Sequence, residues 1–189
     1  MSNAYRTKNS TGLINKNKKI NFSFNGHTYH GYEGDTLASA LISNGIHLIG
    51  RSFKYHRPRG FLGVGVEEPN AMVQLHEGNK SEPNIIATEV ELVEGLKAKS
   101  QNCWPSVQFD IGEVNNLLNR FFPAGFYYKT FMWPKSFWMK IYEPFIRKAA
   151  GMGVAPLQPD PDRYEHNYEH CDVLVVGSGP SGLASALAA

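Results

Sequence analysis

INFSFNGHTYHGYEGDTLASALISNG, residues 20–45, is the stretch from which the fold of this chain is predicted. Apolar and polar residues alternate over residues 20–24, which is the pattern of a strand with one buried face. Asn25-Gly26 follows, and this dipeptide is favoured in tight hairpin turns. We therefore expect a returning strand over residues 27–32.

A short helix is expected after the hairpin. Asp35 or Thr36 can cap its start, because a side-chain oxygen there accepts a hydrogen bond from a free backbone N–H. Gly45 can close it, because glycine adopts the left-handed conformation at little cost. The apolar residues of this helix are Leu37, Ala38, Ala40, Leu41 and Ile42.

The chain continues with a long loop over residues 51–70 and two further strands. Alternation returns over residues 71–75, and residues 85–92 supply another strand, which Glu94-Gly95 ends. The order hairpin, helix, loop, strand, strand predicts an α+β fold in which a small sheet grips one helix, a β-grasp.

The same order fits the plant-type ferredoxin domain, where the loop after the helix carries thiolates that hold a [2Fe–2S] cluster. Such a cluster needs four thiolates, three of them closely spaced. The chain has two cysteines, Cys103 and Cys171, and neither lies between Gly45 and Leu75. We therefore expect a ferredoxin-like domain that lacks cluster ligands and holds no iron–sulfur cluster. The seven histidines show no spacing typical of a metal site.

The stretch RSFKYHRPRG, Arg51–Gly60, mixes basic and aromatic residues without an acid. Three roles are open for it: docking on a neighbouring domain or subunit, contact with a cofactor phosphate, and binding of single-stranded nucleic acid. The net charge of +2 gives no general support for nucleic acid. We favour docking.

Residues 121–145 contain an unusual density of Phe, Tyr and Trp, interrupted by prolines. Aromatic side chains dominate interface energetics, so we expect this surface to be buried on another domain or a partner chain. Short helices are expected around residues 115–120 and 137–149. Prolines make residues 151–170 an extended linker.

The sequence ends in DVLVVGSGPSGLASALAA, residues 172–189, in which Gly177, Gly179 and Gly182 form a G-x-G-x-x-G pattern. An apolar run precedes it and a good helix former follows, which is the context of a dinucleotide-binding turn. Gly177 permits the tight turn, Gly179 lets the backbone approach a pyrophosphate, and Gly182 lets the helix pack close to the strand. The helix N-terminus attracts the anion.

A complete Rossmann unit also needs a second parallel strand, with an acidic residue for the ribose about 20 residues beyond the last glycine. We therefore expect the sequence to be the N-terminal piece of a longer protein, in which later residues decide between NAD and FAD. The predicted parts are a mobile arm at residues 1–19, the β-grasp at 20–110, an aromatic helical segment and linker at 111–170, and the start of a truncated FAD/NAD-binding Rossmann domain at 171–189.

Composition narrows the class of protein further. Two cysteines fit a reducing compartment, and the polar N-terminus does not resemble a signal peptide. No stretch of about 20 residues is apolar enough to span a bilayer. We expect a cytoplasmic chain with neither membrane nor nucleic-acid partners.

Several segments in this order resemble the alpha subunits of heterotetrameric sarcosine oxidases, from about residue 20 to the end. The segments are INFSFNGHTYHGYEGDTLASALISNGI, GRSFKYHRPRG, GVGVEEPNA, SQNCWPS, FMWPKSFWMKIYEPFIRKAAGMG and CDVLVVGSGPSGLASALAA. The glycine pattern alone would be a weaker signal than this ordered set.

The resemblance implies an oxidoreductase that demethylates sarcosine to glycine, producing peroxide and either formaldehyde or methylene-tetrahydrofolate. It implies NAD at Gly177, Gly179 and Gly182, FMN at the alpha–beta interface, FAD in the beta subunit, and beta, gamma and delta subunits as partners. No catalytic residue is identified in residues 1–189. Two alternatives stay open: a subunit of another flavin-dependent amine dehydrogenase complex, of the opine dehydrogenase, proline dehydrogenase or hydrogen cyanide synthase type, and a non-catalytic docking module.

Overall fold

In the computed structural model of the chain, the described residues are 5–7, 12–121, 125, 131–149, 153 and 155–189. The fold begins with an antiparallel hairpin of β1 (Asn15–Phe24) and β2 (His27–Glu33). Asn25 and Gly26 join the strands with φ of +51° and +79°, the left-handed values that the expected two-residue turn requires. The predicted hairpin is present, but β1 begins at Asn15. The expected boundary after residue 19 is therefore corrected, because residues 15–19 belong to the sheet.

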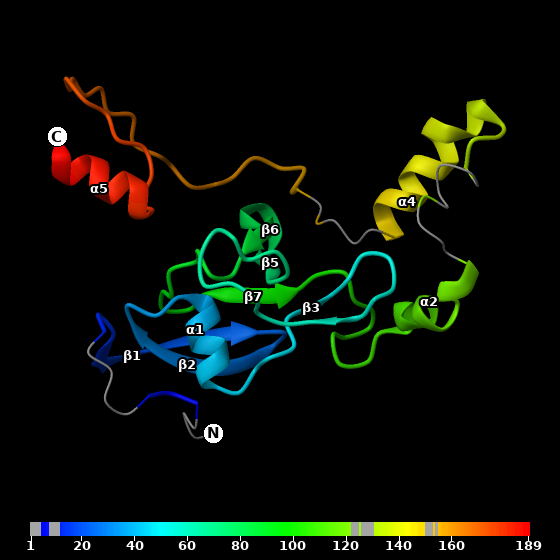
Figure 1. The fold of residues 1–189 in the computed structure, drawn as a ribbon, viewed down its shortest axis with the longest axis horizontal. Coiled ribbons are helices and arrows are strands. Elements are labelled where there is room, and N and C mark those ends of the chain that lie inside the picture. Colours follow the sequence, from blue (N-terminus) through cyan, green and yellow to red (C-terminus); the bar gives the residue numbers. More distant parts are fainter. Residues whose placement is uncertain (1–4, 8–11, 122–124, 126–130, 150–152, 154) are drawn as a thin grey trace.

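Helix α1 (Leu37–Ser43) lies across one face of the sheet (Figure 1). Of the two expected capping residues, Thr36 is the one that caps the helix: the Ser39 N–H donates to Thr36 Oγ1 at 3.2 Å. The Ser39 hydroxyl in turn accepts from the Thr36 N–H at 3.0 Å. Gly45 has φ of +78° and follows the helix as predicted.

The main sheet has the order β2-β1-β7-β5-β6, with β5 at Met72–Leu75, β6 at Glu82–Ile86 and β7 at Lys97–Ser100. Strand β7 runs parallel to β1 and antiparallel to β5, so it joins the two hairpins into one sheet. The strand expected over residues 85–92 ends at Ile86. The chain turns there, and the Glu89 N–H donates a hydrogen bond to the Ile86 carbonyl at 3.0 Å. Two short strands, β3 (Gly50–Arg51) and β4 (Pro58–Arg59), pair separately.

One hydrophobic core lies between α1 and the sheet. It takes the alternating residues of β1, the apolar face of α1, and residues of β5 and the following loops. Its largest fully buried apolar side chains are Phe22, Phe24, Leu37, Leu41, Ile49, Leu92 and Val73. A mixed sheet with one covering helix is an α+β arrangement of the predicted β-grasp kind.

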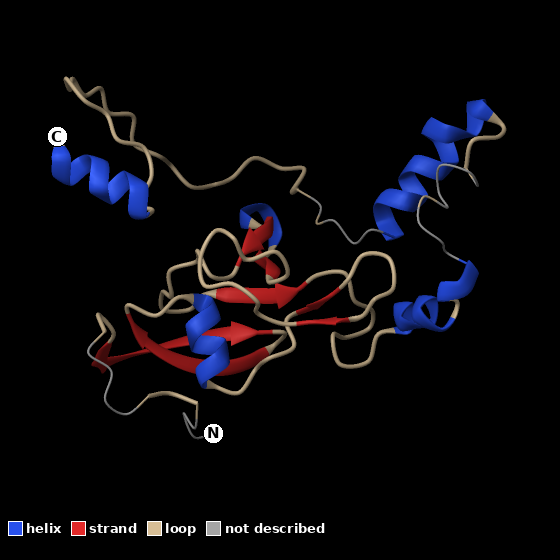
Figure 2. Cartoon of the chain, viewed as in Figure 1, coloured by secondary structure: helices blue, strands red, loops and turns tan. Residues whose placement is uncertain are grey.

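The second half of the described chain is helical in short pieces (Figure 2). A 3₁₀ turn (Ile111–Glu113) leads into α2 (Val114–Leu117) and a second 3₁₀ turn (Asn119–Phe121). Later come a 3₁₀ turn (Lys135–Phe137), a π-helical turn (Trp138–Tyr142) and α4 (Glu143–Ala149). No described helix is long and apolar enough to cross a membrane.

Helix α5 (Pro180–Ala188) forms after the glycine-rich turn, as the sequence predicts. The apolar run before it, residues 173–176, belongs to no sheet, which differs from the expected first Rossmann strand. A strand forms only by pairing, and no described strand lies beside this run. Figure 1 shows α5 apart from the β-grasp, at the end of an extended segment that comes after α4 in the chain.

The described part of the N-terminal arm is docked on the β-grasp through a buried ion pair. Both terminal nitrogens of Arg6 donate to the Asp35 carboxylate, at 3.1 and 2.6 Å, and Asp35 is 1% exposed. Asp35 also accepts from the Tyr32 N–H and the Ser39 hydroxyl. The expectation of a mobile arm is therefore corrected for residues 5–7.

We predict that Asp35→Asn destabilises the chain by about 3 kcal/mol, because removing one partner of a buried ion pair leaves the other charge uncompensated. The measurement is urea unfolding. Glu33→Gln is the matched control, since the Glu33–Lys18 pair on the same hairpin is exposed and contributes little. Equal effects of the two substitutions would contradict the prediction.

Candidate functional site

The basic loop is fastened to the chain by its first arginine. The Arg51 side chain is 3% exposed. Its Nε donates to the Val107 carbonyl at 2.9 Å, and its Nη2 donates to the Gln108 carbonyl at 3.2 Å. Its Nη1 donates to the His56 carbonyl and to Glu113, both at 3.0 Å. Arg51 is therefore a clamp between β3 and the segment before α2, with four of its five N–H donors in use.

A second contact closes the loop on the same segment. His56 Nδ1 lies 2.6 Å from Asp110 Oδ2. The other oxygen of Asp110 accepts from the backbone N–H groups of Trp104 and Gly112, both at 3.1 Å. Asn102 adds two side-chain bonds to carbonyls of residues 51 and 52. These contacts fasten the start of the Arg51–Gly60 loop to residues 102–113 of the same chain, and its docking on a neighbouring domain or subunit stays a prediction.

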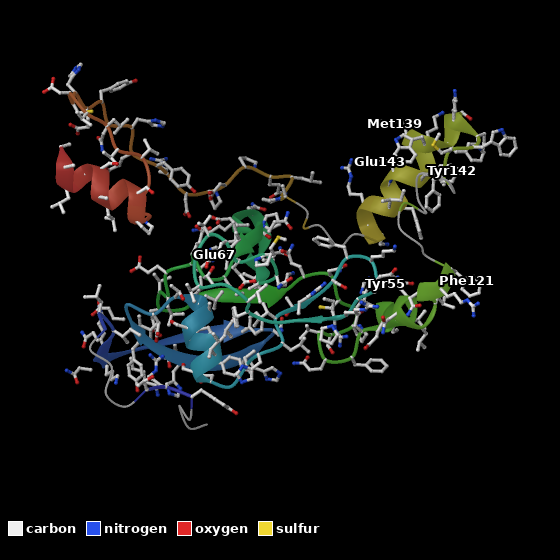
Figure 3. All side chains as sticks on the ribbon, viewed as in Figure 1. Tyr55, Glu67, Phe121, Met139, Tyr142 and Glu143 are labelled. Carbon is white, nitrogen blue, oxygen red and sulfur yellow. The ribbon has the colours of Figure 1, made fainter. Side chains whose placement is uncertain are left out.

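The outer part of the loop presents cations around an aromatic ring. Lys54 Nζ lies 4.9 Å from the centre of the Tyr55 ring, and Arg57 Cζ lies 4.7 Å from it. Arg57 also donates to Asn116 at 2.8 Å. Figure 3 labels Tyr55 in this loop and Phe121 at the end of the helical stretch that contains Asn116.

A pocket of about 300 Å³ opens beside this loop. Arg59, Asn70, Asn84 and Asn102 contribute polar groups to its wall, and Tyr55 contributes an aromatic one. Arg59 makes no side-chain hydrogen bond or ion pair with any described residue. The pocket therefore combines one available guanidinium with amide groups, which suits a small polar or anionic group.

The loop between β4 and β5 is built around two neighbouring carboxylates. Glu68 is 2% exposed and accepts backbone N–H groups from residues 62, 63, 70 and 71 at 2.5–3.2 Å. Burial opposes ionisation of this carboxyl, but its backbone hydrogen bonds hold the pKa of Glu68 below its ordinary value. Exposed Glu67, labelled in Figure 3, accepts from the N–H groups of Val64 and Gly65. The sequence GVGVEEPN, residues 63–70, does not by itself reveal these hydrogen bonds.

The cysteines do not fit a [2Fe–2S] cluster. Cys103 is partly buried and Cys171 is exposed, and burial raises the pKa of the Cys103 thiol. Four thiolates hold a plant-type cluster, and this sequence has two cysteines. Among the described residues no group of three His, Cys, Asp or Glu side chains is placed to hold a metal ion.

The three predicted cofactor-binding glycines come together at the start of α5. Gly177 has φ of +106°, which favours glycine. A Cβ on Gly182 would lie 2.1 Å from the Gly177 carbonyl oxygen, so the close approach requires glycine there. A Cβ on Gly179 would meet nothing within 4 Å, so the space in front of its backbone is open. The geometry suits a bound pyrophosphate, and cofactor binding stays a prediction.

Seven large apolar side chains are exposed to solvent along residues 104–145. We call them the aromatic surface, and each is between 65% and 83% exposed. They are Trp104, Phe109, Leu117, Phe121, Trp133, Met139 and Phe145. Figure 3 shows Met139 on the same helical stretch as Tyr142 and Glu143. The described members of this surface are exposed in the chain itself, so the expected burial of residues 121–145 on another domain or a partner chain stays a prediction; residues 122–124 and 126–130 lie outside the described residues.

The chain is similar in sequence to a domain family and to several known proteins. Residues 17–103 match the family of 2Fe-2S iron-sulfur cluster binding domains. The chain is 59% identical to the sarcosine oxidase subunit alpha of Rhizobium meliloti (strain 1021) over 178 residues, which are 94% of this chain and 18% of that protein. It is 31% identical to the sarcosine oxidase subunit alpha of Corynebacterium sp. (strain U-96), over 92% of this chain and 13% of that protein.

Among solved structures, the L-proline dehydrogenase from P. horikoshii is 26% identical to the matched part. The match covers 44% of this chain and 16% of that chain, with a TM-score of 0.34. The present chain thus spans less than a fifth of the length of the sarcosine oxidase subunits that it matches.

We predict that Arg51→Lys loosens residues 104–113, because an ammonium cannot reach the carbonyls and the carboxylate that the guanidinium fork binds. The expected loss is about 2 kcal/mol in the free energy of unfolding, with faster proteolytic cleavage in this segment. Arg59→Lys is the matched control, because Arg59 has no side-chain partner among the described residues. Unchanged cleavage in Arg51→Lys would show that the clamp does not hold the segment.

Proposed function

We propose that this chain, a homologue of the alpha subunits of sarcosine oxidase along 94% of its length, belongs to the alpha subunit of a complex that oxidises sarcosine. The observation that carries this proposal is the 59% identity, because it extends over 178 residues, which are 94% of this chain. In the proposed reaction sarcosine, water and O₂ give glycine, formaldehyde and hydrogen peroxide. When tetrahydrofolate is present, the methyl carbon leaves as methylene-tetrahydrofolate.

The proposed share of this chain in that reaction is assembly and cofactor binding. FMN at the interface with the beta subunit and FAD in the beta subunit would supply the redox chemistry, so no catalytic residue is assigned to this chain. The aromatic surface would be covered by the remainder of the alpha subunit or by the beta, gamma or delta subunit. The cytoplasmic location expected from the sequence stays a prediction.

The glycine-rich turn is proposed to hold the pyrophosphate of NAD. The first N–H groups of α5 lack intrahelical partners and carry the partial positive charge of the helix N-terminus. Gly179 precedes Pro180 at this end, and its open space leaves the backbone accessible. These features support the proposal that the turn is the first part of a dinucleotide site.

The proposed activity is tested with the complex that copurifies with the natural full-length protein. We expect sarcosine to yield glycine and hydrogen peroxide in equal amounts. Reduction of an artificial acceptor without peroxide would identify a sarcosine dehydrogenase and contradict the oxidase. A complex with its flavins intact that leaves sarcosine unchanged but oxidises another amine would contradict the proposed substrate.

The proposed cofactor site is tested by Gly179→Val in the same full-length protein. Valine can adopt the φ of −68° at this position, but its side chain would fill the space reserved for the pyrophosphate. We expect the purified protein to lose its NAD while the β-grasp keeps its thermal unfolding transition.

Gly12→Val is the control for this substitution, because a Cβ at Gly12 also meets nothing within 4 Å and lies outside the glycine pattern. It should leave the NAD content unchanged. Wild-type NAD content in Gly179→Val would contradict the assignment of the turn.

A further inference from the structure

The loop between β4 and β5 closes around its own carboxylate. Leu62 and Gly63 donate their backbone N–H groups to one oxygen of Glu68, and Asn70 and Ala71 donate theirs to the other. Four donors from two separate stretches of backbone thus converge on one buried anion.

The convergence of these N–H groups on Glu68 has a physical cause. Burying a carboxylate raises the free energy of the folded state unless its oxygens are hydrogen-bonded. Successive backbone N–H groups can form a concave nest whose dipoles favour an anion. No described cation forms an ion pair with Glu68, so the backbone N–H groups alone account for the stabilisation of its charge. The carboxylate and the loop therefore stabilise each other.

The position of the nest in the fold indicates what the carboxylate replaces. The loop lies inside residues 17–103, which match the cluster-binding family. In plant-type clusters three thiolates have the spacing C-x₄-C-x₂-C. The same spacing separates the first donor, Leu62, from Glu67 and from the donor Asn70. A thiolate-ligated cluster is anionic and accepts hydrogen bonds at its sulfurs.

We propose that the carboxylate of Glu68 takes the place of the anionic iron–sulfur cluster as the group around which loop 60–71 folds. The fold then keeps its cluster-type loop without thiolates, because one internal anion satisfies the N–H groups at both ends of the loop. This inference does not rest on the proposed oxidase activity.

The ordered loop reaches the pocket beside the basic loop. Asn70 is both a donor to Glu68 and a residue of the pocket wall. The Thr88 hydroxyl donates to the Gly65 carbonyl at 2.8 Å, which fixes the middle of the loop to the chain after β6. Glu68 is thus a positioning residue for this wall of the pocket.

The first test compares Glu68→Gln with Glu67→Gln in the full chain by amide hydrogen exchange. Glutamine keeps the shape of the side chain but removes the charge and turns an N–H group toward the nest. We expect exchange at residues 62, 63, 70 and 71 to quicken by about tenfold or more in Glu68→Gln, as lost charge-assisted bonds imply. Glu67→Gln should leave these four amides unchanged, because its bonds go to Val64 and Gly65.

The second test vacates the nest with Glu68→Ala and asks whether an added anion refills it. Thermal unfolding is measured in sodium formate and in sodium chloride at equal concentration, with Glu67→Ala as the matched variant. We expect formate to raise the unfolding temperature of Glu68→Ala above its value in chloride, because only formate supplies a carboxylate. Equal temperatures in the two salts, or wild-type exchange in Glu68→Gln, would overturn the proposal.

Discussion

The long loop over residues 51–70 contains little regular secondary structure, so its backbone groups need hydrogen-bond partners from side chains. The remaining structure depends on this constraint. Two buried charges of opposite sign contribute to this: Arg51 joins the start of the loop to a neighbouring segment, and Glu68 binds the backbone at its end. Arg51 binds backbone carbonyls of residues 56, 107 and 108, and Glu68 binds four backbone N–H groups. Because buried backbone groups must be paired, both side chains order the chain around them, and the Glu68 carboxylate does so in the place that a cluster takes in plant-type domains.

The contacts of the basic loop also connect the β-grasp to the helical half of the chain. Arg51 and Asp110 fix the segment that leads into α2, where the aromatic surface begins. A rigid support beneath exposed Phe and Trp side chains is what an interface needs, because less conformational freedom is then lost on association. The ordered basic loop and the exposed surface are therefore consistent with the assembly role proposed for this chain.

The sequence predicted the parts of this fold that local patterns encode. The alternation of apolar and polar residues and the Asn25-Gly26 pair indicated the first hairpin. Thr36 caps the start of the helix and Gly45 follows its end, as expected. Strand β7 was missed because KAKS has one apolar residue, and its pairing with β1 and β5 is a long-range property. Arg6 and Glu68 were missed for a similar reason: a buried charge is defined by distant partners, which no local spacing reveals. The glycine pattern predicted the start of α5, but a strand before it needs a neighbour to pair with.

The central claim is that this ferredoxin-like domain folds around a carboxylate rather than a cluster. Iron and acid-labile sulfide analysis of the full-length protein, purified anaerobically from iron-replete cells, tests it most directly. The account predicts no stoichiometric iron or sulfide in the β-grasp and no electron paramagnetic resonance signal of a reduced [2Fe–2S] cluster. Stoichiometric iron and sulfide with that signal, assigned to this chain, would contradict it.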